Sequence, residues 1–108
     1  MAAAIIRKDT DTATATGADA ELVYAQVSDR SHVLGSVVCG YASAPAATGL
    51  LTIDWDENIV FQIPIGGATP QVFTFDPPLA APRGEPLTVK LSSKTGIAGY
   101  VNASHWLE

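Results

Sequence analysis

The chain has 108 residues, of which 47% are hydrophobic and 16% charged, and its formal net charge at pH 7 is −5. This length allows one small domain, and the apolar content excludes disorder over the whole chain. Because the negative charge repels phosphate groups, we expect no nucleic-acid partner and no membrane partner.

Residues 1–20 differ in character from the remainder. Threonines alternate with aspartate and alanine, and no large apolar residue occurs between Ile6 and Leu22. Such a segment has little to bury, so we predict an extended N-terminal arm at residues 1–20 and a β-sandwich domain at residues 21–108. The arm is either a frayed terminus or a segment that orders against a neighbouring chain by adding a strand to a sheet edge.

From Leu22 onward, short segments of period two alternate with turn residues, and no window has the pattern of a long helix. One segment places Ile59, Phe61 and Ile63 on an inward face. The pattern predicts an all-β fold, either a small barrel or, as we expect, a single jelly-roll-like β-sandwich. About seven strands are predicted, at residues 22–27, 32–42, 50–55, 59–65, 72–75, 87–92 and 97–103.

Catalytic groups are scarce. Each of the two histidines, His32 and His105, follows a serine, but neighbours on a strand point to opposite faces and cannot form a dyad. No Gly-x-Ser-x-Gly motif is present. We therefore expect both histidines at the surface or rim of the sandwich, no catalytic residue, and no enzyme activity.

Metal and cofactor sites are not indicated either. Cys39 is the one cysteine and lies in an apolar strand, where it is predicted to be a buried core residue. Asp54, Asp56 and Asn58 match the first half of a calcium-binding loop, but Ile59 occupies the position that needs glycine. We therefore expect a strand-connecting turn there, with no metal and no cofactor.

Aromatic residues offer one route to ligand binding. Trp55 is in phase with Leu51 and Ile53, which places it in the core or at the rim, whereas Tyr100 and Trp106 are expected to be exposed. Exposed aromatic rings on a β-sandwich can stack against sugars, so a glycan-binding module is an alternative function.

Seven segments of the chain carry a family resemblance. They are residues 33–38, 41–45, 48–53, 60–65, Phe75 with residues 77–79, residues 87–91 and residues 96–102. Together they resemble the small all-β virion proteins of tailed bacteriophages and prophages, in particular those that decorate or cement capsids. The chain departs from these proteins at residues 56–58 and 92–95, where the family usually has glycine in the turn. Both departures lie in loops.

The resemblance implies a homotrimer on the virion capsid surface, made in the host cytoplasm, that bridges subunits of the major capsid protein. We expect the arm to order on the capsid, so that deleting residues 1–20 abolishes capsid binding and leaves a folded body. The alternative is a receptor- or glycan-binding module of a phage head fibre or tail appendage. The predicted interface residues are Ile5, Ile6, Arg7, Thr10, Thr12, Thr14, Tyr100 and Trp106.

Overall fold

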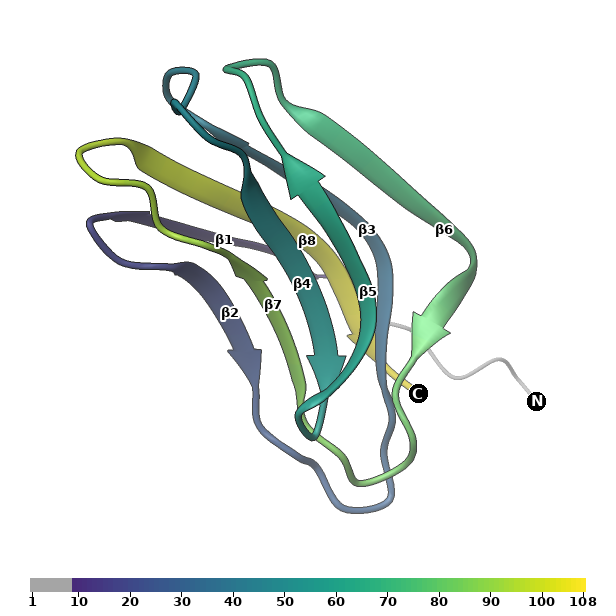
Figure 1. Cartoon of the computed structure of the whole chain (residues 1–108). Helices are drawn as coiled ribbons and strands as arrows, with labels where there is room; N and C mark the ends of the chain where they lie inside the picture. Colours follow the sequence, from purple (N-terminus) through teal and green to yellow (C-terminus); the bar gives the residue numbers. More distant parts are fainter. Residues whose placement is uncertain (1–8) are drawn as a thin grey trace.

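The computed structural model describes residues 9–108, and these residues form eight strands and no helix, so none could span a membrane as a helix. The strands make two four-stranded antiparallel sheets that pack face to face (Figure 1). We call the sheet ordered β1-β8-β3-β6 sheet A and the sheet ordered β2-β7-β4-β5 sheet B. The strands are β1 (Asp9–Thr16), β2 (Ala20–Tyr24), β3 (His32–Tyr41), β4 (Gly49–Trp55), β5 (Asn58–Ile65), β6 (Gln71–Ala80), β7 (Leu87–Leu91) and β8 (Ala98–Leu107).

The strand pairs are nested, with β1 beside β8, β2 beside β7, β3 beside β6 and β4 beside β5. This is the order obtained when one long antiparallel hairpin is rolled into two sheets, and it defines a jelly roll. The predicted jelly-roll-like β-sandwich is confirmed, although the described residues contain one strand more than the seven predicted.

The additional strand corrects the predicted arm. Residues 9–16 form β1, which pairs with β8 from Asp9 opposite His105 to Thr16 opposite Ala98, and Ala20 begins β2. The prediction failed because it required large apolar side chains, whereas an edge strand is also held by backbone hydrogen bonds to its neighbour. Half-buried Ala13 supplies the apolar contact with the core. The sandwich therefore includes residues 9–20.

The core lies between the inner faces of the two sheets. The strand predicted at residues 87–92 has the period-two pattern expected of it, since Leu87, Val89 and Leu91 are fully buried. Cys39 is also fully buried, as predicted, and burial raises the pKa of its thiol to about 11. The other fully buried large side chains are Val33, Leu34, Val37, Tyr41, Leu51, Ile53, Ile65 and Val101.

One predicted inward position in β5 is wrong. Ile59 is 58% exposed, because the pairing of β4 with β5 shifts between Ile53, opposite Phe61, and Asp54, opposite Ile59. Val60 is the extra residue of this bulge. Because of it, Ile59 points to the opposite face of the sheet from the one that strict alternation with Phe61 predicts. Trp55, by contrast, is half-buried against the core, which agrees with the prediction that it lies in the core or at the rim.

Candidate functional site

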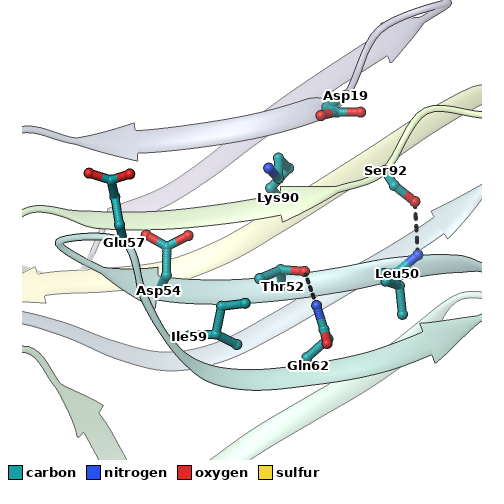
Figure 2. Close-up of a pocket in the computed structure, with 9 residues that line it drawn as sticks. All are labelled: Asp19, Leu50, Thr52, Asp54, Glu57, Ile59, Gln62, Lys90 and Ser92. Atoms are coloured by element: carbon teal, nitrogen blue, oxygen red, sulfur yellow. Dashed lines mark hydrogen bonds between the residues drawn. The ribbon is translucent and has the colours of Figure 1, made fainter.

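A shallow hollow of about 450 Å³ lies on the outer face of sheet B (Figure 2). It is open to solvent along one side of the sandwich, away from the core. Nine residues from three strands and three connections line it: Asp19, Leu50, Thr52, Asp54, Glu57, Ile59, Gln62, Lys90 and Ser92. We refer to these nine residues as the sheet B hollow.

The middle of the hollow is a row of polar side chains on three adjacent strands. Thr52 of β4 lies opposite Lys90 of β7 on one side and opposite Gln62 of β5 on the other. The Gln62 side-chain amide donates a hydrogen bond of 3.2 Å to the Thr52 hydroxyl. Thr52 is only 8% exposed, so it forms the floor, and the longer side chains of Gln62 and Lys90 flank it.

Hydrogen bonds to the backbone hold one end of the hollow in place. The Asp19 carboxylate accepts a bond of 2.8 Å from the Ser93 N–H, and the Ser92 hydroxyl accepts one of 2.8 Å from the Leu50 N–H. The Tyr41 hydroxyl donates to the carbonyl of Ser92 at 2.7 Å. These contacts fix Asp19 and Ser92 before any ligand arrives, which lowers the cost of ordering them on binding.

A tight turn shapes the other end. Asp56 and Glu57 both have positive φ, at 51° and 66°, between the paired residues Trp55 and Asn58. Positive φ at both central residues is the requirement of a type I′ hairpin turn, which matches the twist of the flanking strands. The Asn58 side chain donates to the carbonyl of Asp56 at 3.2 Å. The turn places Glu57 beside Asp54 at the end of the hollow (Figure 2).

The lining is acidic and rich in hydrogen-bonding groups. Three carboxylates and one ammonium group give it a net charge of −2, and the Thr52 and Ser92 hydroxyls and the Gln62 amide are neutral. Two exposed aliphatic side chains, Leu50 at 41% and Ile59 at 58%, lie on opposite sides of the Thr52–Gln62 pair (Figure 2). No aromatic residue is among the nine.

The metal-ligating residue types do not cluster in the part of the chain that the structure describes. Within residues 9–108, no group of three or more histidine, cysteine, aspartate or glutamate side chains is placed to hold a metal ion. The partial calcium-loop pattern spans the end of β4 and the following turn, where Asn58 directs its side-chain nitrogen to backbone carbonyls of Trp55 and Asp56.

The predicted interface residues of β1 and β8 lie together on the outer face of sheet A. Thr14 pairs with Tyr100, and Thr12 and Thr10 pair with the next outward residues of β8. The threonines are exposed and Tyr100 is half-buried over Gly40. Uncharged side chains occupy the surrounding outward positions of sheet A, namely Ser36, Val38, Val72, Thr74, Asn102 and Ser104. Ile5, Ile6 and Arg7 lie outside the described residues.

The expectation that Trp106 is exposed is wrong. It is 7% exposed and lies over Gly35, where an added Cβ would come within 2.8 Å of the indole ring. Glycine at position 35 therefore creates the space that the indole fills. The sequence placed Trp106 near the C-terminus but gave no sign that a glycine of β3 lies beneath it.

The expectation that both histidines lie at the surface or rim of the sandwich is also wrong, because both are buried. His32 and His105 are 3% and 7% exposed, on the inner faces of β3 and β8. The Tyr24 ring stacks on His105 with 3.8 Å between ring centroids, and its hydroxyl donates to the Asp11 carboxylate at 2.7 Å. These side chains join β1, β2, β3 and β8 at one end of the sandwich.

The sheet B hollow was not identified from the sequence. A usable signal was the cluster of carboxylates around the turn after β4. The position of Lys90 between β2 and β4 depends on strand order, which period-two patterns do not contain.

No family model matches the chain, and a search of curated proteins finds no match. Several solved structures are similar. One of them is a carbohydrate-binding module, CBM36, in complex with calcium and xylotriose, with a TM-score of 0.44 and 16% sequence identity over 90% of this chain and 76% of that chain. At this identity, nothing about its ligands transfers to the present chain.

Proposed function

We propose that this chain is a non-enzymatic binding module that holds a neutral saccharide in the sheet B hollow. The observation that carries the proposal is the hollow itself, in which Thr52, Gln62 and Lys90 form a polar row bounded by carboxylates. Recessed surfaces with a few fixed polar groups are the usual ligand sites of small domains.

The groups in the hollow match those of a sugar. Carboxylate oxygens accept hydrogen bonds from sugar hydroxyls, whereas the Gln62 amide and the Lys90 ammonium donate to them. Leu50 and Ile59 each supply aliphatic surface against which the C–H face of a sugar ring can pack, one on each side of the Thr52–Gln62 pair. The net charge of −2 on the lining disfavours sulfated sugars and uronic acids, so the ligand class is neutral.

Titration with neutral oligosaccharides, followed by NMR of the labelled protein, tests this proposal. Shifts are expected to concentrate on β4, β5 and β7, and binding should change little with salt because the ligand carries no charge. Gln62→Ala and Asp54→Asn should each weaken binding several-fold, while Thr74→Ala on the opposite sheet should leave it unchanged. Binding only of cationic peptides, or shifts confined to sheet A, would contradict the proposal.

A second candidate follows from the outer face of sheet A, and we propose it as the site of a structural role in a virion. Thr10, Thr12, Thr14 and Tyr100 lie side by side on a surface whose named positions all lack charge. Depletion of charged residues is typical of the central part of protein interfaces. A flat face of this kind suits contact with subunits of a capsid shell.

Incubation of the protein with assembled capsid shells, followed by sedimentation, tests the second candidate. The intact protein should sediment with the shells, and Ser104→Lys in the middle of this face should reduce the bound fraction. Lys90→Ala in the sheet B hollow is the matched control and should bind as the intact chain does. Equal binding by the Ser104→Lys variant would exclude this face as the contact.

A further inference from the structure

The two sheets have four edge strands, and β1 is the least protected of them. Free sheet edges present unpaired backbone groups to which another strand can add, and proteins usually block them with proline, charge, bulges or short length. The edges here are β1 and β6 in sheet A and β2 and β5 in sheet B.

Three of the edges are blocked. β6 contains Pro77 and Pro78, and its pairing with β3 is interrupted by a register shift. β5 contains Pro64 and the bulge at Val60. β2 is only five residues long and carries Glu21. Each therefore offers at most a short stretch of regular backbone to another strand.

β1 has no proline, no bulge and no lack of length. It runs for eight residues, Asp9–Thr16, in continuous register with β8. Its charged residues, Asp9 and Asp11, lie in its first half, and the stretch from Thr12 to Thr16 carries no charge. Its four threonines have high strand propensity, and Thr10, Thr12, Thr14 and Thr16 are exposed. Figure 1 shows β1 at the margin of sheet A, at the opposite side of the sheet from β6.

We infer that β1 is a self-association edge whose partner is β1 of a second copy, joined antiparallel about a two-fold axis at Ala13. The sequence of the strand is self-complementary in this register. Thr12 would lie opposite Thr14 of the partner subunit, and Thr10 opposite Thr16 of the partner subunit. Threonine pairs directly opposite one another are favourable across antiparallel strands.

Charge disfavours one alternative register of this pair. A register centred on Asp11 would place the two Asp11 carboxylates directly opposite each other, which is destabilising. Centring on Ala13 instead places Asp11 opposite Ala15 of the partner subunit and separates the two carboxylates. The Asp11 carboxylate also accepts the Tyr24 hydroxyl bond within its own chain, so its position is fixed.

The association is expected to be concentration-dependent rather than permanent, because one strand edge covers less than the roughly 1,000 Å² of a stable interface. Two-fold closure uses both β1 edges and leaves no further unblocked edge among the described strands, so growth is expected to stop at the dimer. The sheet B hollow and most of the outer face of sheet A stay accessible in such a dimer.

Sedimentation of the full chain at increasing concentration tests the inference, with the intact protein expected to pass from monomer to dimer. The double variant Thr12→Lys/Thr14→Lys places lysines opposite lysines in the pair and should remain monomeric. Thr74→Lys, the same exchange at the opposite edge of the sheet, should dimerise as the intact chain does. Circular dichroism should confirm that each variant is folded.

A charge-swap experiment completes the test. The double variant Thr12→Glu/Thr14→Glu should also be monomeric alone, and mixing it with the lysine variant should restore the dimer. An intact chain that remains monomeric up to its solubility limit would overturn the inference, as would a trimer. Dimerisation by the lysine variant alone would equally show that β1 is not the contact.

Discussion

The imidazole rings of His32 and His105 are hydrogen-bonded to each other inside the sandwich, with 2.8 Å between His32 Nδ1 and His105 Nε2. His32 Nε2 lies 2.7 Å from the carbonyl oxygen of Ala25, and since a carbonyl only accepts, this nitrogen donates. In a neutral His32 ring, Nδ1 is then an acceptor and His105 Nε2–H donates to it. The bonds form a directed chain from β8 through β3 to the segment after β2.

Replacing either histidine should therefore lower the free energy of unfolding by more than the lost packing contacts account for. His32→Leu leaves the Ala25 carbonyl and the His105 N–H without their partners, and each unsatisfied buried group costs about 1–3 kcal/mol. In the double variant His32→Leu/His105→Leu, both ends of the shared bond are removed together. The losses of unfolding free energy in the two single variants, added together, should exceed the loss in the double variant by about 1–3 kcal/mol. Urea denaturation measures all three values.

A matched cycle provides the control for this prediction. Thr74→Ala, on the outer face of β6, combined with His32→Leu should give additive losses, because the two residues share no contact. Additive losses for the histidine pair itself would show that the 2.8 Å bond contributes no coupling.

The buried thiol of Cys39 predicts an alkaline loss of stability. Burial raises its pKa from the ordinary value of 9.0 to about 11, so the folded state favours the neutral thiol. The contribution of the Cys39 thiol to the free energy of unfolding is fully present below pH 9.0. It is lost as pH rises from there toward about 11, because the thiol ionises first in the unfolded chain. The free energy of unfolding, measured by urea denaturation, should fall across this interval.

Cys39→Ala should show a shallower fall over the same range. In this variant the free energy of unfolding should still fall somewhat with pH, since the pKa of the Tyr41 hydroxyl is also raised, chiefly by burial. Identical slopes in the variant and the intact chain would exclude the thiol as the source. A thiol reagent should, in addition, label the folded protein far more slowly than the urea-unfolded chain.

Truncation of the N-terminal strand should destabilise the sandwich, which is the reverse of what the sequence suggested. Deleting residues 1–16 removes β1, exposes the edge of β8, and removes the hydrogen bond from Tyr24 to Asp11. The midpoint of thermal unfolding should drop well below that of a chain lacking only residues 1–8, which retains every described strand. Equal midpoints would show that β1 contributes nothing to the fold.

The turn after β4 offers a stabilising substitution. Glu57 adopts φ of 66°, a conformation that costs a residue with a side chain about 1 kcal/mol relative to glycine. Glu57→Gly should therefore raise the free energy of unfolding by about 1 kcal/mol in denaturant titration. Gly17→Ala, at φ of 78° with no atom within 4 Å of the added Cβ, should lower it by a similar amount. Opposite signs at the two positions would confirm that backbone conformation governs both.

The alternation of residues along single strands was sufficient to predict the fold class and much of the core. Leu87, Val89 and Leu91 face inward because side chains on a strand alternate strictly, and no distant residue changes that. Ile59 is an exception to this alternation, since it was expected to face inward and is exposed. A bulge adds one residue to the count, and nothing in the apolar pattern of β5 marks the point of insertion.

The histidine pair and the sheet B hollow depend on which strands are neighbours. The prediction that neither histidine pairs with its preceding serine rests on strand geometry. His32 and His105 nevertheless meet because β3 lies beside β8, with Leu34 opposite His105. Lys90 lies beside Thr52 for the corresponding reason in sheet B. Such contacts between distant segments follow from strand order, which the period-two pattern of a single segment leaves open.

The pairing of β1 with β8 has a consequence for how the chain folds. The first described strand can find its place only after the last strand has been synthesised, since Asp9 is held opposite His105. Pairing over so long a loop is slow, and during translation it must wait for the end of the chain. In that interval the threonine-rich segment carries unsatisfied backbone groups on both sides. Early folding is therefore expected to start from the β4–β5 hairpin, with β1 closing the sandwich last.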